Sequence, residues 1–387
     1  MFAIRGLYLP LVACLSAVLP GTPASATSEA VIHSFMGTYH HDGATPLSGL
    51  INIGGTLYGT TSAGGDYGSG VVFRLTPKGI EKVLYAFKGQ GTTRDGGYCL
   101  AGLANLGGVL YGTTQLGGLY NDGAVFKVTL AGAEKILHSF KGAPPGDGQL
   151  PAAGLVNLGG TLYGTTTSGG AYNAGTIFKI TAAGGEKVLH ALKGYPTSDG
   201  GDPVASLVDI DGVLYGTTSG GGTYGFGTVF KITTAGAARV LHAFKGYPTD
   251  GGTPRAALIN VGGKLYGTTS TGGTYGQGTV FRMTTAGAET ALYSFKEVSG
   301  DGRIPNASLT YLGGVLYGTT SQGGAEGKGT VFKVTTGGAE MVLHSFGKGN
   351  DGATPQAGLV ALGGALYGTT TLGGTLNNNG TVFKLTP

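Results

Sequence analysis

The pentapeptide Leu-Tyr-Gly-Thr-Thr constrains this chain more than any other feature, because it occurs seven times at intervals of 50 to 53 residues. Repeats of this length are typical of solenoids and propellers. Three further short apolar runs accompany each copy, and glycine-rich segments separate all four, which predicts four antiparallel strands per repeat. The seven copies begin at Leu57, Leu110, Leu162, Leu214, Leu265, Leu316 and Leu366.

We name the four strands of a repeat A to D in chain order. Examples are 228–233 (C) and 240–244 (D) of one repeat, followed by 257–261 (A) and 265–269 (B) of the next. The first strand D, 31–35, has no strands A to C before it, and the last repeat stops after its strand C, 381–385. Pairing these two strands would close a ring and remove exposed sheet edges. We therefore predict an all-β, seven-bladed β-propeller, closed by its N-terminal strand, with residues 27–387 as a single domain.

Residues 1–26 resemble a secretory signal peptide, with Arg5 as the only charge, an apolar stretch over 7–19 and a small-residue cleavage site at 23–26. Residues 11–14 also resemble a lipobox, in which Cys14 would be lipidated. Both interpretations predict a secreted, periplasmic or cell-surface protein. The apolar stretch is shorter than the about 20 residues that span a bilayer, so no transmembrane segment is expected.

After cleavage, Cys99 is the only cysteine, which excludes an internal disulfide. It stands where the other repeats carry a proline before strand A, so we expect a reduced thiol that serves packing. The formal net charge of the whole chain is +4. This small and evenly spread charge predicts no nucleic-acid partner. We expect a monomer without a cofactor.

The order Pro-x-Ala-x-Leu, Gly-Gly-x-Leu-Tyr-Gly-Thr-Thr, Gly-Gly and Gly-Thr-Val-Phe-Lys resembles the GloVer-type tandem repeat of "choice-of-anchor" exported bacterial proteins. The match covers residues 30–387. The resemblance implies export and a repeat-built β fold, and it implies no catalytic residues. The double glycine before an aromatic strand is also similar to kelch repeats, although the chain has no Trp.

Length variation between repeats is concentrated in the D–A connections, which run 5 to 8 residues before a fixed Asp-Gly pair. In a propeller, the D–A and B–C loops lie on one face, and variable loops on a fixed scaffold are where binding usually occurs. We expect this face to bind a polysaccharide or a protein. Candidate residues that interrupt the repeat in the D–A segments are His40, His41, Arg94, Tyr98, Tyr195, Tyr247, Arg255 and Arg303. The B–C loops supply aromatic rings that either stack on a ligand or pack on a neighbouring loop, namely Tyr67, Tyr120, Tyr172, Tyr224 and Tyr275.

Other polar positions recur in every repeat and favour structural roles. The Asp of each Asp-Gly pair either coordinates a cation at the channel or caps its own turn, with the glycine at positive φ, and the fixed spacing favours the cap. One position of strand D is His in five repeats and Tyr in the other two, at Tyr85 and Tyr293. A site where His and Tyr interchange selects a ring that hydrogen-bonds rather than a metal ligand. We therefore predict no metal site.

The sequence contains no cluster of acids, bases or nucleophiles that breaks the repeat on adjacent blades, as an active site on a symmetric scaffold would require. We predict a non-catalytic binding or scaffold protein and assign no catalytic residue. Two alternatives stay open. One is a hydrolase or lyase that acts on envelope or extracellular polysaccharide from the same face, and the other is a purely structural matrix module.

Overall fold

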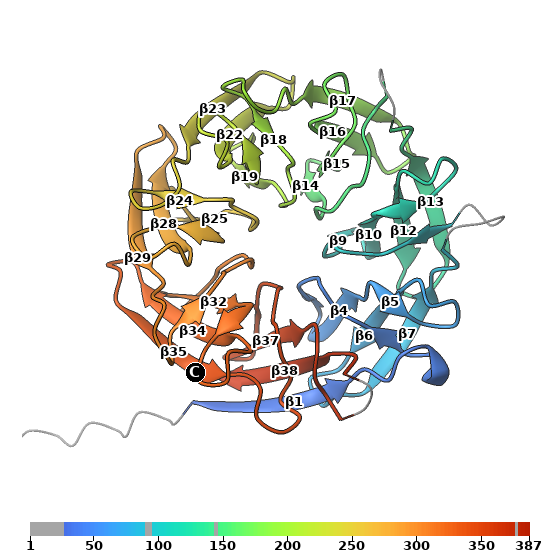
Figure 1. The fold of residues 1–387 in the computed structure, drawn as a ribbon. Helices are drawn as coiled ribbons and strands as arrows, with labels where there is room; N and C mark the ends of the chain where they lie inside the picture. The colour runs from blue at the N-terminus through green and yellow to red at the C-terminus, as the bar shows by residue number, and fades with distance from the viewer. Residues whose placement is uncertain (1–26, 90–94, 143–145, 376–377) are drawn as a thin grey trace, which may run out of the picture.

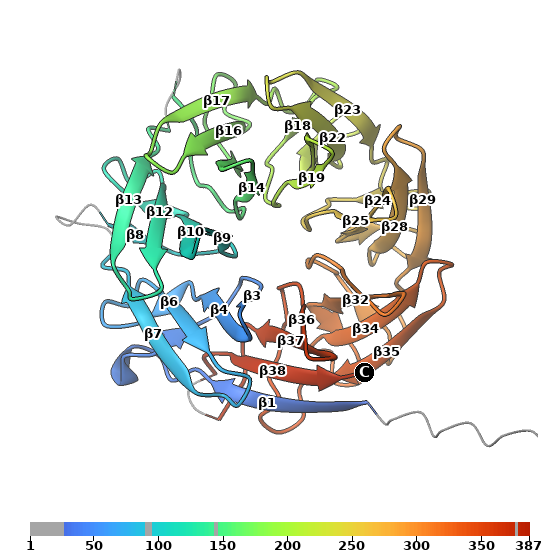
Figure 2. The same cartoon turned by 180° about the vertical axis from the view of Figure 1, so that it is seen from behind.

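The computed structural model describes residues 27–89, 95–142, 146–375 and 378–387. They form seven four-stranded antiparallel sheets arranged in a ring (Figure 1), which confirms the predicted seven-bladed β-propeller. In each blade, strand A lies nearest the central axis and strand D lies at the circumference (Figure 2). The predicted signal peptide, residues 1–26, lies outside the described residues. Within the described part of the chain, no helix is long and apolar enough to cross a bilayer.

The inner two strands of each blade differ in length. The A strands have three residues each and are β3 (Ile51–Ile53), β9 (Ala104–Leu106), β14 (Val156–Leu158), β19 (Val208–Ile210), β25 (Ile259–Val261), β31 (Thr310–Leu312) and β36 (Val360–Leu362). The B strands contain the repeated pentapeptide and are β4 (Thr56–Thr60), β10 (Val109–Thr114), β15 (Thr161–Thr166), β20 (Val213–Thr218), β26 (Lys264–Thr269), β32 (Val315–Thr320) and β37 (Ala365–Thr370).

The outer two strands complete each sheet. The C strands are β6 (Val71–Leu75), β12 (Ala124–Thr129), β16 (Thr176–Thr181), β22 (Thr228–Thr233), β28 (Thr279–Thr284), β34 (Thr330–Thr335) and β38 (Thr381–Thr386). The D strands are β7 (Glu81–Ala86), β13 (Glu134–Ser139), β17 (Glu186–Ala191), β23 (Ala238–Ala243), β29 (Glu289–Ser294), β35 (Glu340–Ser345) and, in blade 7, β1 (Ser28–Ser34). One 3-10 turn, η1 (Thr38–His40), follows β1.

The ring closes as the leftover strands predict. β1 pairs antiparallel with β38, from Ser28 opposite Thr386 to Ser34 opposite Thr381, and the two strands lie side by side in both views (Figures 1 and 2). Blade 7 therefore takes strands A to C from the C-terminal end and strand D from the N-terminal end. This pairing satisfies the backbone groups of β38 that would otherwise form an open sheet edge.

The hydrophobic core lies between adjacent blades, and this explains why the B and C strands are apolar on both faces. Side chains of a strand alternate between the two faces of its sheet. Leu57 packs with residues of blades 7 and 1, whereas its neighbour Tyr58 packs with Leu110 and Phe126 of blade 2. A sheet that is buried on both faces needs near-continuous apolar residues. Glycine at the centre of each pentapeptide leaves room for the strand C phenylalanine, since a Cβ on Gly112 would lie 2.5 Å from the Phe126 ring.

A belt of threonine hydroxyls joins the blades near the axis. The first threonine of each pentapeptide donates from its Oγ1 to a backbone carbonyl that precedes strand A of the next blade, at 3.0–3.3 Å. Thr369 closes the belt by donating to Ser48 of blade 1. In six blades the second threonine bonds within its own blade; for example, Thr166 Oγ1 donates to the Ser168 carbonyl and accepts from the Thr176 N–H. In blade 2, Thr114 Oγ1 is buried without a partner among the described residues. The first threonine therefore joins the blades, and the second bonds locally in six of them.

Removal of the N-terminal strand is expected to destabilise the ring strongly. A chain that begins at Met36 loses the β1–β38 pairing and the buried ring of Phe35, and loss of a buried phenylalanine side chain alone costs about 3–5 kcal/mol. Thermal unfolding followed by circular dichroism would compare it with a chain that begins at Thr27. Equal melting temperatures would show that the β1–β38 pairing does not hold the ring closed.

The belt predicts a specific cost for a single threonine. Thr217→Val keeps the side-chain shape but leaves the Ala256 carbonyl, which Thr217 binds at 3.2 Å, without its donor. A buried group left unpaired costs about 1–3 kcal/mol, so the free energy of unfolding in urea should fall by this amount. The matched control is Thr274→Val on an exposed loop, which should change stability by less than about 0.5 kcal/mol. Equal effects of the two substitutions would contradict the role of the belt.

Candidate functional site

The D–A and B–C loops meet on one face of the ring. In five blades, a two-stranded ribbon pairs the segment before strand A with the start of the B–C loop, and in blades 3 and 7 single bridges join Gln149 to Ser168 and Ala353 to Leu372. We call this face the loop face. The five ribbons are β2 (Gly43–Ala44) with β5 (Ala63–Gly64), β8 (Gly96–Gly97) with β11 (Leu116–Gly117), β18 (Gly200–Gly201) with β21 (Gly220–Gly221), β24 (Gly251–Gly252) with β27 (Thr271–Gly272) and β30 (Gly302–Arg303) with β33 (Gln322–Gly323).

The repeated Asp of each Asp-Gly pair caps the connection between two blades. The Asp95 carboxylate accepts hydrogen bonds from the backbone N–H groups of Gly96 and Lys88, at 2.7 and 2.9 Å. The predicted structural role of the Asp is therefore confirmed. The prediction of positive φ at the following glycine is wrong for most copies, since only Gly148 and Gly352 have it. The other copies need glycine for space, because a Cβ on Gly96 would lie 2.3 Å from the Thr114 side chain.

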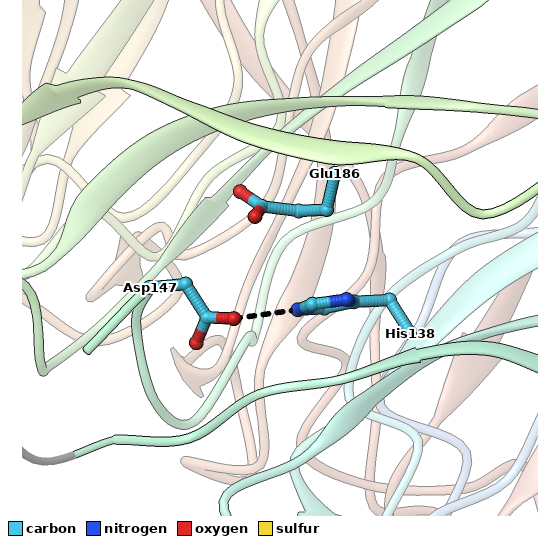
Figure 3. Close-up of side chains that lie close together, drawn as sticks. All are labelled: His138, Asp147 and Glu186. Atoms are coloured by element: carbon cyan, nitrogen blue, oxygen red, sulfur yellow. Dashed lines mark hydrogen bonds and ion pairs between the residues drawn. The ribbon is translucent and has the colours of Figure 1, made fainter.

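A cluster of three residues that includes the Asp lies at six of the seven interfaces between blades, and Figure 3 shows the one between blades 2 and 3. His138 of β13 binds Asp147 through Nε2 at 2.8 Å. Glu186, at the start of β17 in the next blade, lies over this pair, and its Oε1 is buried without a hydrogen-bond partner. Burial and the nearby Asp147 carboxylate raise the pKa of Glu186 to about 7. Although burial opposes ionisation, hydrogen bonds from His138 and the Lys141 backbone hold the pKa of Asp147 below its usual value.

The ligand atoms of His138, Asp147 and Glu186 lie within 4.8 Å of one another, and those of His242, Asp250 and Glu289 do the same. A histidine with two carboxylates is a donor set that transition metals accept. The two repeats with tyrosine in place of this histidine show which property all repeats need at the position. Tyr85 and Tyr293 donate to Asp95 and Asp301 at 2.8 Å, the same bond that histidine makes elsewhere. A polar contact with the Asp is therefore common to the repeats, with His33 the most distant at 3.3 Å from Asp42. The sequence predicts that the ring forms a hydrogen bond, and the structure identifies the Asp as its partner.

The mouth of the central channel is the place on the loop face where the repeats differ from one another. A cavity of about 300 Å³ is lined there by Gln115, Thr167 and one residue from each blade. Gln115 and Thr167 are polar and come from blades 2 and 3. At the position that all seven blades share, blades 1 to 4 contribute an apolar arc, and blades 5 to 7 contribute a polar arc. These residues are Leu47, Leu100, Ala152, Val204, Arg255, Asn306 and Gln356. Below them, small residues of all seven blades narrow the channel to a space of about 130 Å³.

The side-chain amide of Asn306, in the polar arc, makes only one hydrogen bond among the described residues. Its Nδ2 donates to Ser321 Oγ at 3.4 Å, whereas its Oδ1 is buried without a partner among the described residues. Arg255 is exposed, and it is the one sequence-predicted binding residue that lines the mouth cavity in the described part of the chain. The mouth is therefore an amphipathic ring with one guanidinium group.

The predicted tyrosines of the B–C loops stand on the loop face with 46–58% of their surface exposed. Three of them, Tyr120, Tyr172 and Tyr224, carry a lysine ammonium over the ring at 5.7–6.0 Å. Tyr67 and Tyr275 are the other two. The rings surround the channel at a distance from the mouth cavity, whose lining does not include them.

The remaining D–A candidates are spread over several blades. His41 binds Asp66 at 2.5 Å and is largely exposed, and His40 ends the turn before it. Tyr195 and Tyr247 are exposed and follow strand D of blades 3 and 4.

Tyr98 is half-exposed with φ +58°, and its backbone bonds to Ser69 and Gln115. Arg303 is half-buried in β30, and Arg94 lies outside the described residues. Cys99 is fully buried as a free thiol, and burial raises its pKa well above the usual value, which confirms its packing role.

Six of the seven mouth residues were not identified from the sequence, although a signal existed. They occupy the variable position after proline, or after Cys99, in the motif Pro-x-Ala-x-Leu. The first variable position of this motif holds side chains from Ala to Arg, whereas the second holds only Gly, Ser or Ala, which indicates that the first points away from the packed scaffold.

Comparisons with known proteins agree with the fold. A family model described as the Gloeobacter/Verrucomicrobia repeat matches residues 21–173, 82–269 and 248–387. The chain is similar to the computationally designed Ika8 protein, at 14% identity with a TM-score of 0.50 over 92% of this chain and 99% of that one. It is also similar to a candidate 6-phosphogluconolactonase of Bacteroides uniformis, at 13% identity with a TM-score of 0.50 over 77% and 84%. Both likenesses show the fold alone. The curated proteins contain no significant match.

The raised pKa of Glu186 predicts a pH-dependent effect of its substitution. A carboxyl whose pKa is higher in the folded than in the unfolded chain stabilises the fold below its unfolded pKa, and this contribution is lost as pH rises through the folded value of about 7. Glu186→Gln removes the ionisation. The difference in melting temperature, variant minus native chain, should therefore be more positive at about pH 8.5 than at about pH 5. A difference that does not change with pH would contradict the buried, protonated carboxyl.

Proposed function

The chain belongs to the Gloeobacter/Verrucomicrobia repeat family, and we propose that it acts outside the cytoplasm as a non-catalytic propeller that binds a polysaccharide at its channel mouth. The division of the mouth into an apolar and a polar arc carries this proposal. A pyranose ring has the same division, with an apolar face of C–H groups and a polar edge of hydroxyl groups. The cavity volume of about 300 Å³ is at the lower end of the usual range for ligand sites, so it suits a chain end or a single side branch.

In the bound complex, the sugar places its apolar face against the arc from Leu47 to Val204. Its hydroxyl groups bond to the side-chain amides of Asn306 and Gln356. Arg255 adds a charged donor, which favours sugars that carry a carboxylate or several acceptor oxygens. The seven mouth positions follow proline or Cys99 on a closed ring, so the site needs little ordering when the ligand binds.

The exposed tyrosines support a polymer rather than a free sugar. Rings on rigid loops offer flat faces for stacking at a low cost in side-chain entropy. Tyr120, Tyr172 and Tyr224 belong to three consecutive blades, so a chain that leaves the mouth would meet several such rings in succession. This arrangement favours extended contact across the loop face, beyond the unit bound at the mouth.

The mouth predicts which substitutions abolish binding. Arg255→Ala with Asn306→Ala should weaken binding of a recognised polysaccharide by at least about tenfold, or 1.4 kcal/mol. Native and variant chains would be assayed by affinity electrophoresis against a panel of neutral and acidic extracellular polysaccharides. The control, Asp211→Ala with Lys264→Ala, changes two exposed residues at A–B turns on the opposite face and should leave binding unchanged.

Three results would contradict the proposal. The panel contains no polysaccharide that binds, the opposite-face control loses binding instead, or a bound polysaccharide is cleaved with release of new chain ends. Cleavage would identify the hydrolase or lyase alternative. Circular dichroism of both variants would establish that the fold is retained.

A further inference from the structure

The interface between blades 3 and 4 lacks two side chains that the other interfaces share. At six interfaces, a phenylalanine after strand D packs edge-on against the strand C phenylalanine of the next blade, with ring centroids 5.0–5.4 Å apart. Leu192 replaces the first of these rings between blades 3 and 4. Ala238 begins strand D of blade 4, where the other six D strands carry a glutamate in the cluster of Figure 3.

Both replacements remove volume at the same place and leave a cavity of about 600 Å³ between β17 and β23. Phe230 forms its floor and is 3% exposed, whereas the equivalent strand C rings of the other blades are fully buried. This volume lies well within the usual range for small-molecule sites. An open recess of about 710 Å³ also runs along β1, but its cluster retains Glu29. The cavity between blades 3 and 4 is on the circumference side of the ring, apart from the mouth.

The polar lining of this cavity has more positive than negative charge. Asp199 accepts a hydrogen bond from His190 Nε2 at 3.0 Å, as His138, His242 and His344 bind their Asp residues. Lys193 and Arg239 also line the cavity. Asp199 is the one carboxylate of this lining, because Ala238 stands where the other six interfaces carry a glutamate. The hydroxyl groups of Thr197, Ser198 and Thr223 complete the polar lining.

We propose that the cavity between blades 3 and 4 binds a polyhydroxylated carboxylate, such as a sugar acid or a uronate unit of a polymer. The ligand carboxylate pairs with Lys193 and Arg239, which outnumber the single carboxylate of the lining. Ligand hydroxyl groups donate to Asp199 and bond to His190, in the space that the missing glutamate leaves. The ring of the ligand covers the exposed part of Phe230. This site is independent of polysaccharide binding at the mouth.

The repeat itself supplies substitutions that close the cavity without foreign side chains. Leu192→Phe with Ala238→Glu restores the residues of the other six interfaces, so the variant should fold with an equal or higher melting temperature. Arg239→Met removes one cation and installs the residue that Met341 provides at the same position in blade 6. Isothermal titration would measure D-glucuronate, D-gluconate, D-glucose and inorganic phosphate against the native chain and both variants.

The native chain should bind glucuronate or gluconate at least about tenfold more tightly than glucose or phosphate, a difference of at least 1.4 kcal/mol. The double variant should lose this binding, and Arg239→Met should weaken it. A folded double variant with unchanged affinity, equal affinity for phosphate, or a native chain that binds none of the acids would overturn the proposal. Polygalacturonate distinguishes the two sources of ligand. Binding through the cavity identifies a uronate unit within a polymer, and binding of the monomers alone identifies free sugar acids.

The same variants separate this proposal from the one above. The double variant should retain polysaccharide binding at the mouth, and Arg255→Ala with Asn306→Ala should retain binding of the small acids. Loss of both activities in either folded variant would show that mouth and cavity are one site, and it would contradict their independence.

Discussion

The hydrogen bond from the first threonine of each pentapeptide to the next blade is the interaction on which this ring depends. Near the axis, the two residues that follow each mouth position are glycine, alanine or serine, so no large side chain is available to join the blades there. Thr113, for example, reaches the Ala153 carbonyl of the following blade at 3.0 Å. Farther out, aromatic and aliphatic side chains take over this role. The inner edge is therefore held by polar bonds, the outer part by hydrophobic contact, and each interface needs the same residues.

The same division explains why most polar residues of this chain are structural. The Asp of each D–A connection binds backbone N–H groups on both sides, and His or Tyr of the preceding blade adds a further donor. Glu186 completes such a cluster with a carboxyl that burial keeps protonated up to about neutral pH. A network that recurs at successive interfaces contributes to the connection of blades, since each copy makes the same bonds. The two proposed binding sites instead lie where the residues of one repeat differ from those of the others.

The repeat is broken in two different ways, and only part of one of them is visible in the sequence. The loop face and Arg255 are visible, because residues that interrupt a repeat appear as additions. The ring of residues around the mouth is not, since these residues come from one variable position per repeat and are about 50 residues apart in the chain. The cavity between blades 3 and 4 is not visible either, because Leu192 and Ala238 are merely smaller than their counterparts. A small side chain in place of a large one carries no chemical signal until the neighbours around it are known.

By itself, the sequence determined the number of blades, the order of strands within them and the closure by β1, because the period and the unmatched strand D leave one consistent pairing. It also indicated that the His or Tyr of strand D forms a hydrogen bond, since the interchange restricts the chemistry, but it did not indicate that the partner is the Asp. Only the tertiary structure decided which variable residues share a space. Closing the ring brings seven distant positions to one mouth, and packing of blade 4 on blade 3 converts two missing side chains into one cavity. Both depend on distances through space that repeat spacing does not encode.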